Sequence, residues 1–103
     1  MSQQAFEGVK VADFSWIGVG CITSRYLANH GATVVHVEAH NRPDLLRLSH
    51  PTKDGVGGID LGWWMDDYNT GKLGMSVDLT TPKGQQIARK LISWADVVTE
   101  AFA

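Results

Sequence analysis

The segment 68–103 constrains the fold most, because two strand patterns flank one capped helix within it. Over residues 75–79 large apolar side chains alternate with small or polar ones, the period of two that is typical of a strand. Thr81 can cap the next helix, and Pro82 suits its first position, where the missing N–H leaves no hydrogen bond unmade. A second strand is predicted over residues 96–99. The buried stripe that we predict for the helix consists of Ile87, Leu91, Ile92 and Trp94.

The first forty residues repeat this order of elements. We predict a strand over residues 9–14, a helix over 21–30 and a strand over 33–38, the last being rich in β-branched residues. Gly31 follows the predicted helix where a left-handed conformation commonly ends one. Two strands joined by one helix form a right-handed crossover and lie parallel. We therefore predict an α/β fold, a Rossmann-like open parallel sheet with βαβ units, in a single domain over residues 1–103.

The connection over residues 39–68 has a weaker pattern, with two prolines and the glycine-rich run 54–58. A connection of this length inside a small domain is commonly functional or mobile. We expect short helical turns near residues 44–47 and 61–65.

Composition limits the class of protein and its partners. With 44% hydrophobic and 19% charged residues, a globular chain is expected. The net charge of −2 provides no basic field for nucleic acid. Cys21 is the only cysteine, which excludes an intrachain disulfide and suits a reducing compartment. The amino terminus lacks a signal pattern, and no run approaches the ~20 apolar residues of a membrane span. A soluble cytoplasmic protein without a membrane partner is predicted.

The first candidate site is a glycine loop that follows a strand and precedes a helix. Gly18 and Gly20 lie in this loop, and Glu38 ends the next strand 20 residues after Gly18. This is close to the dinucleotide fingerprint, in which glycines admit a pyrophosphate and the acid holds a ribose hydroxyl. Thr23 stands at the third glycine position. A nucleotide-binding module of the NAD type and a plain βα turn are both compatible with this pattern.

The histidines and the two adjacent aspartates are weaker candidates for a functional site. Three histidines fall around one predicted strand, namely His30, His36 and His40. Alternation places His36 and Glu38 on the same sheet face. His36 and His40 are four residues apart but fall around a predicted strand, so they do not form the helical pair of a zinc site. We expect satisfied or solvated histidines and no metal. Asp66 and Asp67 are adjacent and should point apart, which favours a solvated loop over a general acid/base pair.

Aromatic residues form a third candidate site. They are Trp16, Trp63, Trp64 and Tyr68, in loops expected at one end of the sheet. Ligands of open α/β sheets bind beyond the carboxyl ends of the strands, and Trp16 directly follows the first strand. An adenine ring could stack there, or the tryptophan could cap the edge of the core.

Five blocks of the sequence follow one another in a distinctive order. They are residues 6–14 (FEGVKVADF), 26–32 (YLANHGA), 34–38 (VVHVE), 68–79 (YNTGKLGMSVDL) and 95–102 (ADVVTEAF). Together they resemble, in the same order, the family III CoA-transferases of the formyl-CoA and carnitine CoA-transferase type. Five blocks in register make chance a poor explanation. The resemblance implies a truncated portion of the Rossmann-like core of the large domain.

The resemblance further implies that loops of this core hold CoA, in enzymes that are interlocked homodimers. The residues implied for CoA contact are Gly18, Val19, Ala39, Val77, Asp78, Leu79, Thr80, Ala101, Phe102 and Ala103. Family members commonly carry an arginine at Ala39, a lysine at Thr80 and an asparagine at Ala101, so side-chain donors are fewer here. Arg42 is our candidate for the charge missing at Ala39, because a guanidinium offers a fixed fork to phosphate.

The family's chemistry is nucleophilic catalysis by a carboxylate. An aspartate accepts the acyl group as a mixed anhydride and then gives an enzyme-bound CoA thioester. The resemblance places that aspartate, and the small domain, after the block 95–102. We therefore expect no catalytic residue within residues 1–103, no transfer by this polypeptide alone, and at most weak CoA binding. The alternatives are the NAD-type module and a structural domain that oligomerises through its sheet edges.

Overall fold

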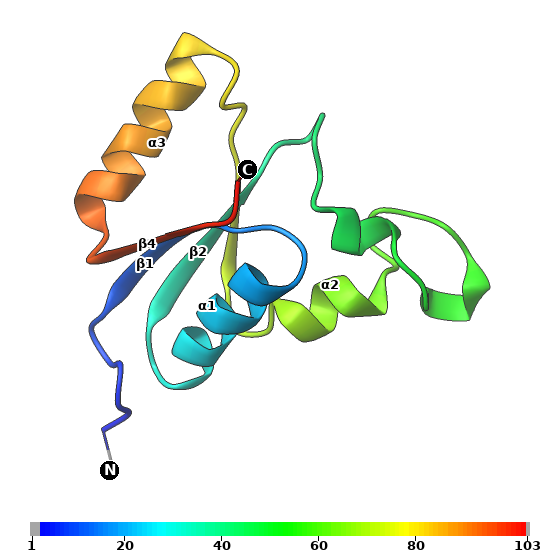
Figure 1. Cartoon of the computed structure of the whole chain (residues 1–103). Coiled ribbons are helices and arrows are strands. Elements are labelled where there is room, and N and C mark those ends of the chain that lie inside the picture. Colours follow the sequence, from blue (N-terminus) through cyan, green and yellow to red (C-terminus); the bar gives the residue numbers. More distant parts are fainter. Residues whose placement is uncertain (1–2, 103) are drawn as a thin grey trace.

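The computed structural model describes residues 3–102 and contains a parallel four-stranded sheet with helices on both faces (Figure 1). The strands are ordered β3-β2-β1-β4, and every neighbouring pair is parallel. The strands and α-helices are β1 (Lys10–Phe14), α1 (Val19–Asn29), β2 (Thr33–Glu38), α2 (Trp63–Tyr68), β3 (Leu73–Ser76), α3 (Pro82–Trp94) and β4 (Val97–Glu100). The predicted α/β fold with an open parallel sheet is confirmed.

The strand β1 lies inside the sheet, paired with β2 on one side and β4 on the other. Because parallel strands run the same way, their carboxyl ends meet at one edge. The chain leaves that edge after Phe14, Glu38, Ser76 and Glu100. The loops that begin at these four residues are therefore gathered at one end of the sheet.

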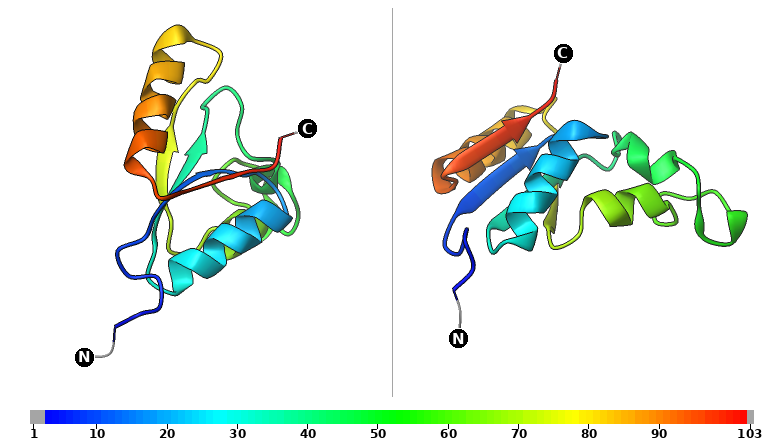
Figure 2. Two further views of the ribbon diagram at one scale, coloured as in Figure 1. Left: turned by 60° about the vertical axis from the view of Figure 1, so that its left-hand side comes forward. Right: turned by 60° about the horizontal axis from the view of Figure 1, so that its bottom comes forward.

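One face of the sheet is covered by α3 and is apolar (Figure 2). The buried cluster on this face consists of Ala12, Phe14, Val35, Val37, Val77, Ala88 and Leu91. Alternate residues of β1 and β2 supply it, as the period of two requires. The opposite face, under α1, has a small apolar cluster at its amino end, formed by Val11, Ala32 and Val34, followed by buried polar residues.

Helix α3 begins as the sequence predicts. The Thr81 hydroxyl accepts a hydrogen bond of 3.0 Å from the N–H of Gly84, and Pro82 takes the first helical turn. The predicted buried stripe is only partly right, because Leu91 is buried whereas Ile87, Ile92 and Trp94 are exposed. The helix packs on the sheet through Ala88 and Leu91 instead, and its buried Gly84 lies against the Asp78 carbonyl of the preceding turn.

The predicted strand over residues 75–79 occurs earlier in the chain, as β3. Its pairing with β2 runs from Val35↔Leu73 to Glu38↔Ser76, and β2 ends at Glu38. Val77 therefore has no further strand partner, although its N–H still donates to the Glu38 carbonyl at 2.7 Å. The predicted elements over residues 9–14, 21–30, 33–38 and 96–99 correspond to β1, α1, β2 and β4 within two residues.

The connection 39–68 contains ordered short elements that extend away from the sheet (Figure 1). They are the 3₁₀ turns η1 (Leu45–Leu48) and η2 (Lys53–Gly55) and the helix α2. Asp44 caps η1 by accepting a hydrogen bond of 3.0 Å from the N–H of Leu46. The turn expected near residues 44–47 is thus present, and the one expected near 61–65 is the slightly later α2.

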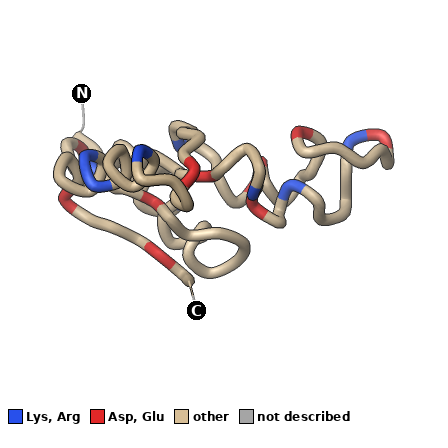
Figure 3. Tube along the Cα trace, turned by 90° about the horizontal axis from the view of Figure 1, so that it is seen from above, with Lys and Arg blue, Asp and Glu red and all other residues tan. Residues whose placement is uncertain are grey.

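Acidic and basic residues are interspersed along the chain (Figure 3). Arg25 pairs with Asp67, and Arg47 pairs with both Glu38 and Asp60. Within residues 3–102, no helix has both the length and the apolar character needed to cross a bilayer.

Candidate functional site

A cavity of about 180 Å³ lies at the carboxyl ends of the strands. The loops after β1, β2, β3 and β4 all contribute to it. Its lining residues are Trp16, Val37, Glu38, Ala39, Asn41, Arg42, Val77, Asp78, Leu79, Thr80 and Phe102. Most of the residues predicted to contact CoA therefore lie around one space, although they come from three separate stretches of sequence.

Trp16 forms one wall of this cavity. Its indole Nε1 donates a hydrogen bond of 2.9 Å to the carbonyl of Val37, which fixes the ring beside the end of β2. Phe102 packs against it edge to face, with ring centroids 5.7 Å apart. Two aromatic rings thus border the cavity next to the edge of the apolar core, where an aromatic ligand ring could stack.

The turn between β3 and α3 forms the opposite wall and is internally hydrogen-bonded. The Asp78 carboxylate accepts from the Thr80 N–H at 3.0 Å and from the Thr80 hydroxyl at 2.6 Å. These bonds hold the pKa of Asp78 below its usual value. The Thr81 hydroxyl also donates to the Asp78 carbonyl at 3.0 Å. The turn is therefore held by its own hydrogen bonds.

Charge at the cavity comes from Arg42, Glu38 and Asp78. Among the described lining residues, Arg42 is the only cation, and its backbone N–H donates to the carbonyl of Ala39 at 3.0 Å. This turn brings Arg42 beside Ala39, as the prediction of a substitute charge requires. Glu38 is occupied, because Arg47 donates to both of its carboxylate oxygens at 2.8 Å. Burial alone would raise the pKa of Glu38, but the hydrogen bonds from Arg47 and from the Asp44 N–H, together with the nearby positive charge, outweigh it and lower that pKa.

Other predicted contact residues lie elsewhere. Gly18 precedes α1 and Val19 begins it, and neither lines the cavity; the side chain of Val19 is 83% exposed. Ala101 is exposed and packs near Gly20 rather than into the cavity. Ala103 lies outside the described residues. Contact of these residues with CoA stays a prediction.

The glycine loop is a close helix-to-strand contact. A Cβ on Gly20 would lie 2.3 Å from the Cβ of Ser15, so only glycine fits there without movement. Thr23, at the third glycine position of the fingerprint, faces outward and donates to the Val19 carbonyl at 2.8 Å. Because Glu38 is held by Arg47, its carboxylate is not free to bind a ribose hydroxyl. These contacts favour the plain βα turn.

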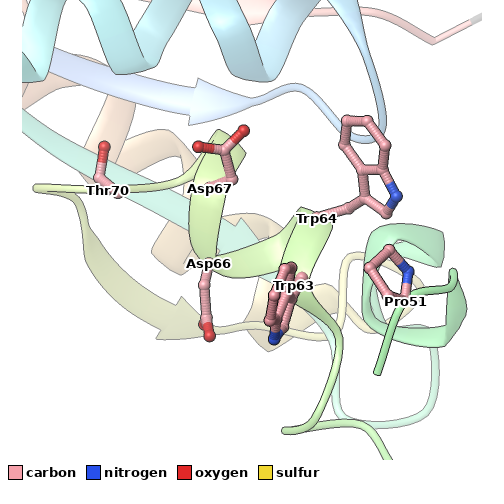
Figure 4. A pocket seen from close by; sticks show the side chains of 6 residues that line it. All are labelled: Pro51, Trp63, Trp64, Asp66, Asp67 and Thr70. Carbon is pink, nitrogen blue, oxygen red and sulfur yellow. The ribbon is translucent and has the colours of Figure 1, made fainter. Parts of the chain in front are cut away.

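The four aromatic residues do not share one end of the sheet. Trp63 and Trp64 line a separate cavity of about 530 Å³ with Pro51, Asp66, Asp67 and Thr70. Figure 4 shows Trp64 and Asp67 on one side of α2 and Trp63 and Asp66 on the other. Tyr68 packs edge to face on Trp64, 5.0 Å between centroids. The two aspartates point apart as predicted, but they lie on a helix rather than in a loop.

A buried polar network under α1 is the main feature that the sequence interpretation missed. Asp13, near the carboxyl end of β1, is fully buried. Its carboxylate oxygen Oδ2 lies 3.0 Å from His36 Nδ1, 2.9 Å from Lys72 Nζ and 2.8 Å from Ser24 Oγ. Its other oxygen accepts from the Thr99 hydroxyl at 2.7 Å. Alternation along the two strands is the sequence signal that bears on Asp13 and His36, and the register Asp13↔His36 of the folded sheet sets them side by side.

The network fixes the charge of its members. Burial alone would raise the pKa of Asp13, but the His36 hydrogen bond and the Lys72 ammonium outweigh it and hold that pKa well below its usual range. Burial would lower the pKa of His36, and the Asp13 and Asp44 carboxylates raise it instead. Burial raises the pKa of the Cys21 thiol to about 12. Asp13 is thus an anion in the interior, matched by the cation Lys72.

Asp44 joins this network to the loop after β1. Its carboxylate accepts from the N–H of Ile17 at 3.1 Å, and Ile17 has a positive φ of 66°. A β-branched residue is strained in that region, so the contact with Asp44 helps to hold the loop. Cys21 Sγ lies 3.6 Å from Asp44 Oδ2 and donates to the Ser15 carbonyl at 3.3 Å. Loop, helix and sheet therefore meet at Asp44.

The fold is an α/β core with a parallel sheet and a cavity beyond the strand ends, and sequence comparison gives the family. The model of the family "CoA-transferase family III" matches residues 6–103, so this chain belongs to the family III CoA-transferases. The resemblance seen in the five sequence blocks is thereby confirmed.

Individual relatives are similar over nearly the whole chain. Succinyl-CoA:(R)-benzylsuccinate CoA-transferase subunit BbsE of Thauera aromatica is 34% identical over 98 residues, which cover 95% of this chain and 23% of that protein. Formyl-CoA:oxalate CoA-transferase of Bradyrhizobium sp. (strain ORS 278) is 29% identical over 99 residues, covering 96% and 22%. A CaiB/BaiF family protein from Brucella suis has a similar structure, with a TM-score of 0.84, 28% identity, and coverage of 98% and 26%. The chain thus spans about a quarter of the length of these proteins.

Proposed function

We propose that this chain forms part of the CoA-binding site of a family III CoA-transferase. The observation that carries the proposal is the cavity at the strand ends, which gathers Ala39, Arg42, residues 77–80 and Phe102 around one space. Ligands of open α/β sheets bind at this edge. The relatives named above act on CoA thioesters, according to their names.

Each wall of the cavity suits one part of CoA. Trp16 and Phe102 offer ring faces and edges for the adenine. Arg42 is the cation available for a phosphate group, since Arg47 is engaged by Glu38. The ordered turn over residues 77–80 offers backbone groups for the polar pantetheine arm.

The reaction that we propose for the complete enzyme is transfer of CoA between an acyl-CoA and a carboxylic acid. The resemblance places the acyl-accepting aspartate beyond the block 95–102. We therefore predict that the 103-residue polypeptide alone gives no turnover. Transfer of CoA from an acyl-CoA to any carboxylate by this purified polypeptide would contradict the prediction.

Thermal unfolding with CoA, NAD and ADP in separate samples tests the binding proposal. A ligand at about 100 times its Kd adds roughly 2.7 kcal/mol, or on the order of 10 °C for a domain of this size. We expect stabilisation by CoA and a smaller effect of ADP, which shares only part of the molecule. Stabilisation by NAD alone would favour the nucleotide module. No response to any of the three would leave the structural domain as the better hypothesis.

A pair of variants ties the response to the cavity. Arg42→Ala should reduce the CoA-induced shift in Tm, because it removes the cation from the lining. Arg25→Ala is the matched control, since Arg25 lies on α1 and pairs with Asp67 away from this cavity. Each variant is compared with and without CoA, so that its own effect on stability cancels. Equal CoA responses in the two variants would argue against a phosphate contact at Arg42.

We also propose that the chain self-associates as a homodimer. The resemblance implies interlocked dimers, and the edge strands carry exposed apolar side chains at Leu73, Val97 and Val98. Light scattering on the purified chain should give twice the monomer mass. A monomer at all concentrations would contradict this part of the proposal and leave the CoA test unaffected.

A further inference from the structure

Three side chains of different chemistry converge under α1. Cys21 comes from α1, His36 from β2, and Asp44 from the loop before η1. Their exposed fractions are 0%, 3% and 0%. One ligand-type atom from each lies within 4.8 Å of the others. We propose that these three residues form a binding site for a divalent transition-metal ion, with Zn²⁺ the best match to the donors.

Two of the distances between donor atoms match those of a tetrahedral ion, and all three atoms lie within 4.8 Å of one another. His36 Nε2 lies 3.5 Å from Asp44 Oδ2, and Cys21 Sγ lies 3.6 Å from the same oxygen. Zinc bonds of about 2.0–2.3 Å at tetrahedral angles separate neighbouring ligand atoms by roughly 3.3–3.6 Å. One thiolate, one imidazole and one carboxylate are typical zinc donors, and the fourth position is left for solvent.

The state of His36 is the second, independent indication. Its Nε2 is buried and makes no hydrogen bond of good geometry within residues 3–102, and the carboxylate oxygens Asp44 Oδ2 and Glu38 Oε1 lie 3.5 Å and 4.0 Å from it. A buried nitrogen without a well-formed hydrogen bond is costly unless a ligand uses it. On the other side of the ring, Nδ1 lies 3.0 Å from the Asp13 carboxylate. A carboxylate behind a metal-binding imidazole is the usual arrangement, because it fixes the tautomer and leaves Nε2 to bind the ion.

The local charge also accommodates the ion. The charged side chains around the three donors are the anions Asp13, Glu38 and Asp44 and the cations Lys72 and Arg47. With His36 neutral, they leave one excess negative charge. When the ion binds, the Cys21 thiol releases its proton to solvent, as does His36 where both of its ring nitrogens are protonated, so the donors are a thiolate and a neutral imidazole. The divalent ion and the thiolate together add one positive charge, so the group as a whole becomes neutral.

A cavity beside the three donors gives an ion access to the site, and a bound ion would connect separate segments of the chain. His36, Glu38 and Lys72 line a cavity of about 370 Å³ next to α2. Asp44 belongs to the segment that carries Ala39 and Arg42, which line the cavity at the strand ends. The ion would tie that segment to α1 and β2. The metal site is independent of the proposed CoA site, and either can fail without the other.

Titration of the chelator-treated 103-residue chain with Co²⁺ alone tests the proposal. We expect one ion per chain, intense visible bands of tetrahedral Co²⁺, and a thiolate-to-cobalt charge-transfer band in the near ultraviolet. Cys21 is the only cysteine, so that band reports on it in the unmodified chain. Zn²⁺ added afterwards should displace Co²⁺ and abolish the bands.

Two variants locate the ion. Cys21→Ser should lose the thiolate band, whereas His40→Gln, which removes an exposed histidine, should keep it unchanged. X-ray absorption of the Zn²⁺-loaded unmodified chain should show one sulfur at about 2.3 Å among nitrogen and oxygen neighbours. This measurement decides the question if Cys21→Ser does not fold. A thiolate band that is absent from the unmodified chain, or a shell without sulfur, would overturn the proposal, as would one ion shared by two chains.

Discussion

The two faces of the sheet are built from the same strands, but one is held by apolar packing and the other by buried polar contacts. On the α3 face, alternate residues of β1 and β2 meet Ala88 and Leu91 in an apolar cluster. On the α1 face, the intervening residues Asp13 and His36 meet Lys72 in a network of buried charges and hydrogen bonds. Both faces exclude water, but only the second depends on specific partners.

The difference shows which face of the sheet depends on particular side-chain partners. An apolar face tolerates changes of shape at moderate cost, because burial is non-directional. A buried charge instead needs each partner, since the interior cannot replace the lost hydration. The polar face adjoins the loop after β1 and the residues before η1, which border the candidate CoA cavity. We infer that the α3 face mainly supplies stability and that the α1 face positions the loops.

The largest effect is expected from Asp13→Ala. This change leaves the Lys72 ammonium, whose side chain is 2% exposed, without its buried counter-charge. Removing one partner of a buried pair costs about 3–5 kcal/mol, a large part of the stability of a domain of this size. Urea unfolding with chelator present measures the loss. Adding Lys72→Met should restore part of it, and a double variant no more stable than the single one would contradict the pairing.

A smaller loss is expected on the apolar face from Leu91→Ala. The side chain is buried against the sheet, and its truncation costs about 2–4 kcal/mol through lost burial and a cavity. Ile92→Ala is the matched control, because the neighbouring side chain is 44% exposed and should matter less. The same urea measurement compares them. Equal losses at the two positions would mean that α3 docks on the sheet through a different side.

A still smaller loss of stability is expected from a change at the start of α3. Thr81→Ala removes the hydroxyl that accepts from Gly84 N–H, at a cost of about 1 kcal/mol. Thr81→Ser keeps the capping oxygen and should be nearly neutral. Thermal unfolding of both variants checks this. If serine were as harmful as alanine, the threonine methyl group rather than the cap would be the stabilising element.

The smallest effect is expected from Asp60→Ala. Asp60 pairs with Arg47 at 3.2 Å, but its side chain is 84% exposed. Exposed ion pairs contribute below about 1 kcal/mol and weaken with salt. Urea unfolding at low and high salt should show little change in either condition. A loss as large as that of Asp13→Ala would mean that burial does not determine how much a charged pair contributes to stability.

Several features were predictable because they rest on local patterns. The strand-helix-strand order follows from hydrophobic period, and the Thr81-Pro82 start of α3 follows from capping chemistry. Alternation correctly placed His36 and Glu38 on one face. The helical period did not reveal that Ile87, Ile92 and Trp94 stay exposed, because a period does not say which part of an apolar stripe faces the sheet.

The sequence by itself determined the fold class, the family and most of the residues that line the candidate cavity. These depend on short-range periodicity and on ordered sequence blocks. Only the tertiary structure decided the buried network, in which Asp13 meets Lys72 from 59 residues away and Thr99 from 86 residues away. The physical reason is that spacing along the chain carries no information on such contacts. Strand order and loop packing bring these side chains together, and those are properties of the folded molecule.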